Sequence, residues 1–344
     1  MKLAVIGTGY WGKNHVRVLK ELLEEDKLDK LFVCDIDPAR AKEIATNYGV
    51  PYYTNYNELP SLDGVIIATP SITHYEIAKK FLKEGKDVLV EKPMTLKSKE
   101  AEELIQIAEK NGNVLMVGHI FRYHPAVVEL KNKIERGDFG RIYYMMSNRF
   151  SLRQPRKDMG VLFALGIHEV DVFCYLLNKE YPDAIFATIE NYIGEVEETA
   201  QIILYFEGGI KGYAFESWIT PVYGKKRELI VVGSRLSAFV DYLKPNEIKF
   251  FDSMIESGRV ATEGSYIVPL EYKEPLKEEL KDFIECIKTR KKPIADMYVG
   301  KRAVEMIEKA MKSAKEGRRT AVSYTHLRAH ETRHDLVCRL LLEK

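Results

Sequence analysis

The stretch Lys2-Leu3-Ala4-Val5-Ile6-Gly7-Thr8-Gly9-Tyr10-Trp11-Gly12 decides the fold. An apolar strand runs directly into the pattern G-x-G-x-x-G, and a helix with an apolar inner face is predicted over residues 11–25. Gly7 permits a tight turn, Gly9 lets the backbone approach a diphosphate, and Gly12 allows the helix to pack closely on the strand. Amides and dipole at the start of such a helix favour an anion. The stretch therefore predicts a dinucleotide site that also includes Tyr10 and Trp11.

A second strand, over residues 31–34, ends in Asp35. A carboxylate at this position accepts hydrogen bonds from the adenosine ribose and repels a 2′-phosphate, so NAD is favoured over NADP. Arg40 follows closely enough to weaken this preference. Asp37 precedes Pro38 and is interpreted mainly as the cap of the next helix, although it could share the role of Asp35.

Polar and charged residues follow further strands at 63–68, 88–90 and 114–117, with helices predicted between them. This alternation predicts a doubly wound parallel sheet, whose carboxyl edge is where ligands bind. The residues that we assign to the cofactor site at this edge are Thr69, Pro70, His74, Glu91 and Lys92. Simple helix capping is the alternative at residues 71–74, and a solvated strand end is the alternative for Lys92.

After residue 120 the predicted order of strands and helices changes. Strand-like runs, several of which alternate apolar and polar residues, extend from about residue 141 to 252, and helices are predicted over 126–136, 275–289 and 299–315. Such alternation predicts a large, mostly antiparallel sheet with helices on one face. The fold class is therefore α/β, with an NAD-binding Rossmann domain over residues 1–120 and a substrate-binding and oligomerisation domain over 121–323. Residues 324–344 are interpreted as a foreign or disordered tail.

Three short motifs together identify a resemblance to a known family. They are GTGYWG at residues 7–12, ATP at 68–70 and EKP at 91–93, and the chain up to about residue 323 resembles the glucose–fructose oxidoreductase and inositol dehydrogenase family. The resemblance implies a C-terminal α/β domain with a large open sheet, and a homodimer or homotetramer. It also implies that Lys92 is the active-site lysine, in a motif whose Lys-Pro bond is often cis, and that Arg122 lies near the active-site cleft.

One further family pattern, G-x-x-x-D-x-G-x-H-x-x-D, is matched in part. The matching residues are Gly160, Gly166, His168 and Asp171, whereas Ala164 stands where the family has an aspartate. The absence of this aspartate removes a carboxylate from the expected substrate site. A lone histidine is most often a buried, satisfied residue, but here it occurs together with Lys92 and a cofactor motif. Histidine titrates near neutral pH, so we predict His168 as general base, with Lys92 stabilising the developing alkoxide.

Residues 149–158 are strongly cationic and precede this pattern. A solvated loop is one interpretation; the other is that Arg153 and Arg156 bind a phosphate or carboxylate of the substrate. The run R-x-x-R-x-D-x-G-V-L-F-x-L-x-I-H resembles family members that oxidise the 3-hydroxyl of UDP-N-acetyl-hexosamines. We therefore predict an NAD-dependent nucleotide-sugar dehydrogenase, with Asp171 also in the substrate site. The alternatives are a dehydrogenase of free cyclitols or simple sugars, and a non-catalytic NAD-binding module.

The composition of the chain bears on its possible partners, its compartment and its metal sites. A formal net charge of +1 gives no argument for binding nucleic acid or an anionic membrane. No apolar run approaches the ~18 residues of a membrane span, and neither a span nor a signal peptide is expected. The four cysteines are scattered, which favours a reducing cytoplasm without disulfides or cysteine metal sites. His326, His330 and His334 have helical spacing, but we interpret them as part of the tail and predict no metal.

Overall fold

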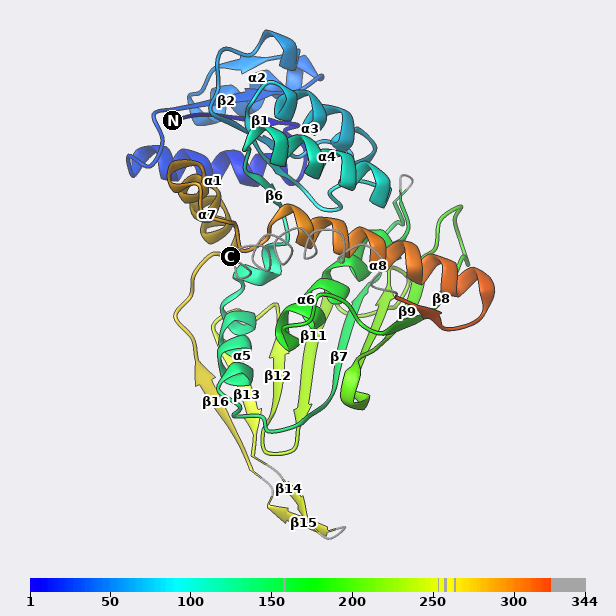
Figure 1. Cartoon of the computed structure of the whole chain (residues 1–344). Helices are drawn as coiled ribbons and strands as arrows, with labels where there is room; N and C mark the ends of the chain where they lie inside the picture. Colours follow the sequence, from blue (N-terminus) through cyan, green and yellow to red (C-terminus); the bar gives the residue numbers. More distant parts are fainter. Residues whose placement is uncertain (157–158, 253, 257–258, 263, 323–344) are drawn as a thin grey trace, which may run out of the picture.

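The computed structural model describes residues 1–156, 159–252, 254–256, 259–262 and 264–322 (Figure 1). The predicted tail and its three histidines therefore lie outside the described residues. Within these ranges, no helix combines the length and the apolar character that crossing a membrane requires. The same part of the chain contains no group of three or more His, Cys, Asp or Glu side chains arranged to hold a metal ion.

The first sheet has six parallel strands in the order β3-β2-β1-β4-β5-β6. These strands are β1 (Lys2–Ile6), β2 (Lys30–Cys34), β3 (Tyr52–Tyr53), β4 (Gly64–Ile67), β5 (Asp87–Val90) and β6 (Leu115–Val117). The central strands β4 and β5 are buried along their whole length, which explains their continuous apolar sequence. Ile6 aligns with Cys34 and Ile67, so the turns after β1, β2 and β4 meet at one edge. The predicted doubly wound parallel sheet is confirmed.

Helices and short turns follow these strands along the chain. They are α1 (Gly12–Glu24), α2 (Pro38–Tyr48), α3 (His74–Lys83) and α4 (Ser98–Asn111), with 3₁₀ turns η1 (Tyr56–Glu58), η2 (Ser71–Thr73) and η3 (Ile120–Tyr123). The inner face of α1 is apolar, and Val16, Leu19 and Leu22 are fully buried. Asp37 caps α2, because its carboxylate accepts from the amides of Ala39 and Arg40 at 3.0 and 3.2 Å. The interpretation of Asp37 as a cap is confirmed.

The second sheet has nine strands in the order β16-β13-β12-β11-β7-β10-β9-β8-β17. Its strands are β7 (Ile142–Ser151), β8 (Ala184–Glu190), β9 (Thr199–Tyr205), β10 (Lys211–Ser217), β11 (Lys225–Gly233), β12 (Ser237–Asp241), β13 (Glu247–Phe251), β16 (Ser265–Pro269) and β17 (Thr320–Ala321). Every neighbouring pair is antiparallel except β7 and β10. A 3₁₀ turn, η5 (Glu207–Gly209), joins β9 to β10, and a small ribbon, β14 (Met254–Glu256) and β15 (Arg259–Thr262), extends from the far end (Figure 1). The mostly antiparallel sheet is confirmed.

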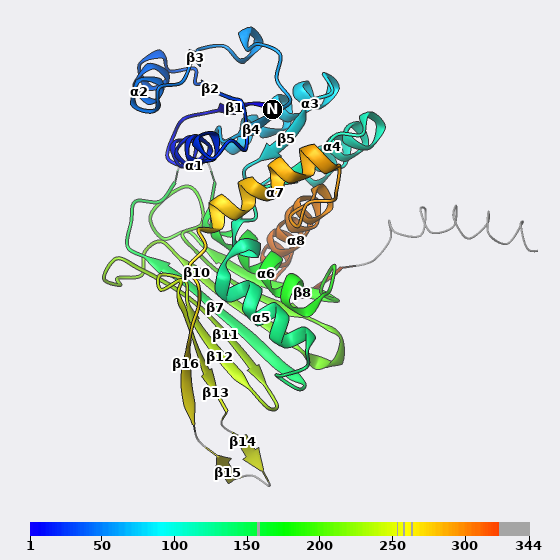
Figure 2. The ribbon, with the colours of Figure 1, turned by 90° about the vertical axis from the view of Figure 1, so that its left-hand side faces the viewer.

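Helices cover one face of this second sheet. They are α5 (Pro125–Glu135), α6 (Ile167–Leu177), which follows the π-helical turn η4 (Leu162–Gly166), and α8 (Met297–Glu316), as Figures 1 and 2 show. The strand positions that point at these helices, such as Leu229 and Val231, are fully buried. Alternate positions on the same strands are only partly buried. The sheet therefore has one covered and one open face.

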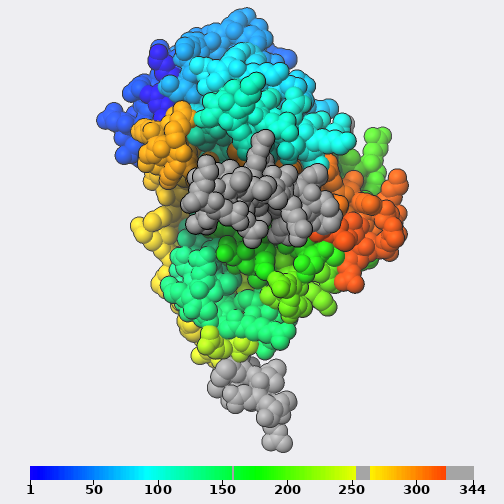
Figure 3. Space-filling view, in the orientation of Figure 1, coloured from blue at the N-terminus to red at the C-terminus, as the bar shows by residue number. Residues whose placement is uncertain are grey.

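Helix α7 (Pro275–Thr289) belongs to the C-terminal half of the sequence but packs on the N-terminal half. Its buried side chains Leu280, Phe283 and Ile284 share one apolar core with β1 and α1. In the space-filling view, the gold atoms of α7 lie directly against the blue N-terminal region (Figure 3). Because one helix contributes to both halves, the two parts of the chain are held together by a shared core. The predicted boundary at residues 120/121 stays a prediction.

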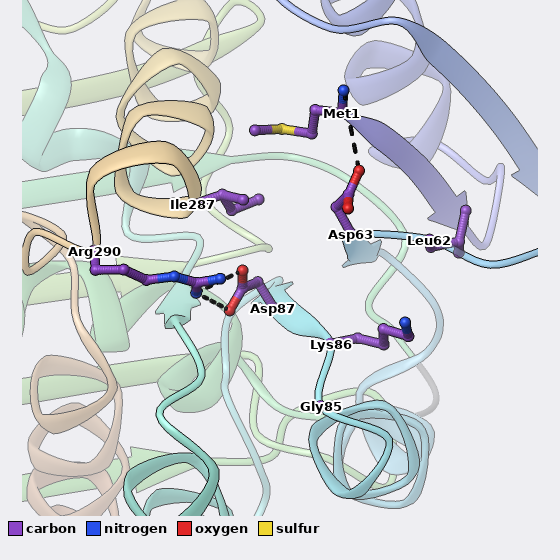
Figure 4. A pocket seen from close by; sticks show the side chains of 8 residues that line it. All are labelled: Met1, Leu62, Asp63, Gly85, Lys86, Asp87, Ile287 and Arg290. Carbon is purple, nitrogen blue, oxygen red and sulfur yellow. Dashed lines mark hydrogen bonds and ion pairs between the residues drawn. The ribbon is translucent and has the colours of Figure 1, made fainter.

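A cavity of about 370 Å³ lies beside α7 at the amino edge of the first sheet (Figure 4). Its lining includes Met1, Asp63 and Asp87, which precede or begin β1, β4 and β5, and Arg290, which follows α7. Arg290 donates to both oxygens of Asp87 at 2.7 and 2.8 Å. Ligands of open α/β sheets bind at the carboxyl edge. The cavity is thus at the opposite edge from the expected chemistry, and we interpret it as a junction that anchors α7.

Candidate active site

The glycine-rich turn has the geometry that a dinucleotide diphosphate requires. Gly7 has a φ of +85°, and a Cβ there would come within 2.8 Å of the backbone of Ala68 and Thr69. A Cβ on Gly12 would lie 1.8 Å from the carbonyl oxygen of Gly7. A Cβ on Gly9, in contrast, would meet nothing within 4 Å. The first and third glycines are therefore needed for packing, whereas the second leaves an open approach to the backbone.

The same turn offers hydrogen-bond donors to an anion. Among the described residues, no backbone carbonyl accepts from the amides of Gly9, Tyr10 or Trp11, and Trp11 caps α1 without a side-chain hydrogen bond. The side chain of Tyr10 is mostly exposed. Free amides at a helix N-terminus, beside an open approach at the second glycine, fit a diphosphate. The residues present therefore fit the predicted cofactor.

Asp35 is placed to accept from a ribose. Its carboxylate is buried and accepts from the amide and hydroxyl of Thr8 at 2.7 and 2.9 Å, and from the amide of Asp37 at 3.0 Å. Burial opposes ionisation, but these hydrogen bonds outweigh it and hold the pKa of Asp35 below its usual value. The guanidinium of Arg40 lies 3.4 Å from the same carboxylate. Asp35 is therefore a fixed negative charge at the end of β2, with a cation beside it.

His74 and Thr69 form part of the framework of the sheet edge. The ring nitrogens of His74 lie 2.8 Å from the carbonyl oxygen of Pro93 and 2.9 Å from that of Thr69. The histidine thus connects the turn after β4 to the turn after β5, where the Lys92-Pro93 bond is cis. Thr73 donates its hydroxyl to the hydroxyl of Thr69 at 2.7 Å. Burial lowers the pKa of His74. Of the predicted residues at this edge, Thr69 and Pro70 are less buried than His74.

Glu91 is held by α1, the helix that begins at the cofactor turn. His15 Nε2 lies 2.7 Å from Glu91 Oε1, and both side chains are buried. Burial opposes ionisation of Glu91, but His15, Lys92 and His74 outweigh it and lower the pKa of this carboxyl. The His15–Glu91 pair therefore ties the cofactor helix to the turn that carries Lys92.

The side chain of Lys92 reaches from the end of β5 in the first sheet to a residue in the second half of the chain. Its Nζ donates to the carbonyl oxygen of Ala164 at 2.7 Å. Ala164 lies in the π-helical turn η4, a rare conformation that is common at functional sites. Burial lowers the pKa of Lys92 to about 8; the charge of Glu91 opposes this shift, and Arg156, Arg149 and Arg227 add to it. The ammonium group is therefore partly buried, oriented and unusually easy to deprotonate.

His168 lies in the first turn of α6, four residues after Ala164. Its ring is buried against Phe121, with the two ring centres 4.9 Å apart and an edge-to-face arrangement. Within the described residues, His168 Nδ1 has no hydrogen-bond partner. Burial, followed by the charges of Lys92 and Arg149, lowers the pKa of His168 well below its usual value. The imidazole is therefore neutral at neutral pH and able to accept a proton.

Three charged residues on neighbouring strands form a row near this histidine. They are Arg149, Glu216 and Arg227, and the sequence pattern did not assign them to the site. Arg149 on β7 aligns with Glu216 on β10 and with Arg227 on β11, and Arg149 forms a buried ion pair with Glu169, the residue after His168. The Arg149 guanidinium also lies 4.2 Å from the centre of the Phe121 ring. The three strand residues are far apart in sequence, so only the strand register brings them together. A charged residue at an inward position of a strand is the one signal that could have found them.

Arg122 and Asp171, both predicted to bind substrate, are paired with each other. The Arg122 guanidinium donates to the Asp171 carboxylate three times, at 2.6, 3.0 and 3.0 Å, and to the carbonyl oxygen of Ile294 at 3.1 Å. His119 Nδ1 lies 3.3 Å from the same carboxylate. Although burial opposes ionisation, the charge of Arg122 holds the pKa of Asp171 far below its usual range. This pair connects η3 to α6 and to the segment before α8.

Arg153 and Arg156 lie in the segment that follows β7. The backbone amide of Arg153 donates to the carbonyl oxygen of Trp218 at 3.0 Å, and its guanidinium lies 5.6 Å from the Trp218 ring centre. The side chain of Arg153 is exposed, whereas Arg156 is partly buried and its charge lowers the pKa of Lys92. Of these two predicted residues, Arg156 is thus the one whose charge reaches the lysine.

The matched glycines of the histidine motif are explained by packing. A Cβ on Gly160 would overlap the Glu197 carboxyl group at 1.8–2.0 Å, and a Cβ on Gly166 would lie 2.8 Å from Ile202. Ala164, at the position where the family has an aspartate, contributes its backbone carbonyl to Lys92. The structure therefore brings Lys92 and the His168 motif together through the backbone at this position.

The fold, the cofactor turn and the partly buried lysine together define a dinucleotide-dependent oxidoreductase. Two models of one family match the chain: "Oxidoreductase family, NAD-binding Rossmann fold" over residues 1–119, and "Oxidoreductase family, C-terminal alpha/beta domain" over residues 131–322. The chain belongs to this family, as the sequence motifs predicted. It is an NAD-dependent oxidoreductase of sugars or polyols, so the predicted enzyme class and cofactor are confirmed and the non-catalytic alternative is not retained.

Curated relatives act on two kinds of substrate. A scyllo-inositol 2-dehydrogenase (NAD(+)) of Bacillus subtilis is 28% identical over 312 residues, 86% of this chain and 88% of the relative. A UDP-N-acetylglucosamine 3-dehydrogenase of Acidithiobacillus ferrooxidans is 32% identical over 185 residues, 53% of this chain and 56% of the relative. A solved structure of a UDP-N-acetylglucosamine 3-dehydrogenase of Acidithiobacillus ferrooxidans matches with a TM-score of 0.80 and 24% identity, covering 92% of this chain and 98% of that chain. This last match shows the same fold.

We predict that Asp35→Ser shifts the cofactor preference toward NADP. The change removes the charge that repels a 2′-phosphate and leaves Arg40 with its ion pair to Asp37 at 3.3 Å, so that the guanidinium can turn to a 2′-phosphate. The ratio of kcat/KM for NAD to that for NADP should fall at least about tenfold, or ~1.4 kcal/mol. Steady-state kinetics with both cofactors measure it. Asp37→Asn, which keeps the helix cap, is the control and should retain the preference for NAD. An unchanged ratio in Asp35→Ser would show that another residue discriminates.

Proposed function

We propose that this enzyme oxidises the 3-hydroxyl of a UDP-N-acetyl-hexosamine with NAD. The observation that carries the proposal is the gathering of three guanidinium groups around the catalytic pair, of which Arg149 is already paired with Glu169. Arg149, Arg156 and Arg227 all lower the pKa of Lys92 through their charge, and two of them also act on His168. A neutral polyol does not need so many cations, whereas the diphosphate of a nucleotide sugar is stabilised by them.

The relatives support two candidate substrate classes. The resemblance to the UDP-N-acetylglucosamine 3-dehydrogenase has the higher identity, but it spans about half of the chain. The resemblance to the inositol dehydrogenase has lower identity and spans most of it. The cationic surroundings of Lys92 favour the nucleotide sugar, and a free cyclitol is the second candidate.

His168 acts as the general base in this proposal. Burial and the neighbouring cations keep its imidazole neutral at neutral pH, so it can take the proton of the substrate hydroxyl. Lys92, oriented by the carbonyl of Ala164, places its ammonium group near the same oxygen and stabilises the negative charge that develops there. The bound NAD supplies the acceptor for the hydride that leaves carbon. The reaction therefore yields a keto sugar, with the proton held on His168.

The remaining predicted residues have positioning roles in this proposal. Glu91 holds the turn of Lys92 against α1, and His74 holds that turn against the end of β4. Arg122 and Asp171 hold η3 against the start of α6, which carries His168. Because these groups satisfy one another, they fix the distance between the cofactor edge and the base. Gly9, Tyr10, Trp11 and Asp35 would hold the cofactor itself.

We also propose that the open face of the second sheet binds a second copy of this chain. Partly buried apolar side chains form one continuous row across six neighbouring strands. By strand register the row consists of Phe186, Ile203, Tyr213, Met146, Ile230 and Phe239. An apolar row of this length on a sheet face favours burial against a partner, and the predicted homodimer or homotetramer would cover it.

A substrate panel tests the proposed reaction. We expect the highest kcat/KM with UDP-N-acetylglucosamine, and lower values with myo-inositol and glucose, measured as NADH formation. Arg153→Ala should lower kcat/KM at least about tenfold for the UDP-sugar alone, because one charge-assisted contact is lost. Arg136→Ala, on the far end of α5, is the matched control. Lys92→Ala should keep NAD binding and lose at least about a hundredfold in turnover. Faster oxidation of myo-inositol than of any UDP-sugar would contradict the proposed substrate.

Ile230→Asp tests the proposed interface. A charge in the middle of the apolar row should leave the fold intact and dissociate the oligomer, because a buried unpaired carboxylate is unfavourable. Sedimentation velocity at micromolar protein should show a smaller species than the unmodified protein. Asn132→Asp, on the outer face of α5, is the control and should keep the parent mass. A monomeric parent protein, or the same mass in both variants, would exclude this interface.

A further inference from the structure

Arg227 is one of the three guanidinium groups whose charge acts on Lys92. It is on β11, where Leu229 and Val231 point into the helix-covered core. Because side chains two positions apart lie on the same face of a strand, Arg227 points to that face as well. Its register partner is Arg149, whose partner on the next strand is Glu216. The guanidinium of Arg227 thus ends a charged row that runs across three strands.

The charges of the other two members of this row, Arg149 and Glu216, are explained by their own surroundings. Arg149 forms its ion pair with Glu169, and its guanidinium lies on the Phe121 ring. Glu216 is completely buried, and neither of its carboxyl oxygens has a hydrogen-bond partner among the described residues. Burial and the charge of Glu169 raise the pKa of Glu216 well above its usual value, which favours the neutral form of this carboxyl. Among the described residues, neither Glu169 nor Glu216 forms an ion pair with Arg227, although the charges of both act on it.

Arg227 itself has no anionic partner in the described part of the chain. None of the ion pairs found there includes it, and its neighbour Glu228 pairs instead with Lys226 at 3.2 Å. Burial and the charge of Arg149 lower the pKa of Arg227, as expected for a partly buried cation without a counter-ion. A guanidinium in this situation gains most from a ligand that brings oxyanions.

The position of Arg227 indicates which ligand it meets. Its charge acts on both Lys92 and His168, so it lies close to the proposed reaction centre. The same strand continues backward to Lys225, which aligns with Ser151, and Ser151 is followed by the Arg153 segment. Arg227 therefore lies near the catalytic pair and two strand positions from the end of β7 that leads to the Arg153 segment. In a nucleotide sugar, only one ring atom separates the anomeric carbon, which carries the phosphate, from the carbon that carries the 3-hydroxyl.

We propose that Arg227 binds the phosphate attached directly to the sugar of the substrate. This inference rests on the proposed function, since it requires a sugar that carries a phosphate. The planar fork of the guanidinium matches two phosphate oxygens, and partial burial strengthens the interaction. Arg227 would then distinguish phosphorylated sugars from free cyclitols, because a neutral ring in the same site leaves its charge without a partner.

Titration calorimetry with UDP tests this assignment. The protein is first saturated with NADH, so that UDP cannot enter the cofactor site. We expect Arg227→Gln to raise the Kd for UDP about 10- to 100-fold, the range expected for a lost charge-assisted hydrogen bond. Arg227→Lys, which keeps the charge but not the fork, should give an intermediate loss. Lys226→Gln is the matched control and should stay within about twofold of the parent protein.

The outcomes separate this inference from the proposed function. If UDP-sugars are oxidised but neither their KM nor the Kd for UDP changes in Arg227→Gln, the inference is wrong and the function stands. If the variant loses affinity for NADH and keeps it for UDP, Arg227 serves the cofactor diphosphate and the inference is also wrong. If no UDP-sugar is oxidised but UDP binding still depends on Arg227, the phosphate site stands and the proposed reaction fails. Absence of UDP binding to the parent protein overturns the phosphate site.

Discussion

The hydrogen bond from Lys92 Nζ to the carbonyl oxygen of Ala164 is the contact on which the site depends. It joins the carboxyl edge of the first sheet to the turn that precedes His168. Burying an ammonium group is costly unless it is hydrogen-bonded and compensated. Here the carbonyl supplies the hydrogen bond, and the ionised Glu91, held by His15, supplies the opposite charge. This contact therefore links the cofactor edge directly to the turn before the proposed base, and the Arg122–Asp171 pair and the shared core of α7 support the same arrangement.

The cations around this contact determine which protonation states of Lys92 and His168 are favoured. Burial and neighbouring guanidinium groups make the charged forms of Lys92 and His168 less stable than usual. The base is thus neutral, and the lysine is an acid of moderate strength. A developing alkoxide, or a phosphate near Arg227, lowers the energy of the whole cluster because it brings the missing negative charge. Arg149 is the exception, since Glu169 already neutralises it.

Local features were predictable from the sequence, and features that depend on register were not. The turn at Gly7–Gly12, the acid at Asp35 and the strand ending in Lys92 each follow from a few consecutive residues. Arg149 and Arg227 become neighbours only when β7 and β11 align, and no local pattern specifies that alignment. The Arg122–Asp171 pair likewise joins elements almost fifty positions apart, |i−j| = 49. Helix α7 was predicted with its correct bounds, but its packing on the first core depends on tertiary contacts.

The pH dependence of kcat/KM for the sugar, at saturating NAD, tests the roles of Lys92 and His168 most directly. The depressed pKa of His168 means that the base is ready below neutral pH, whereas Lys92 loses its stabilising charge as pH rises through about 8. The account predicts a plateau that falls above about pH 8, and an upward shift of this fall in Lys92→Arg, whose guanidinium stays charged. A rate that instead rises through pH 8 in the parent protein would show that neutral Lys92 is the base, and would contradict the assignment of His168.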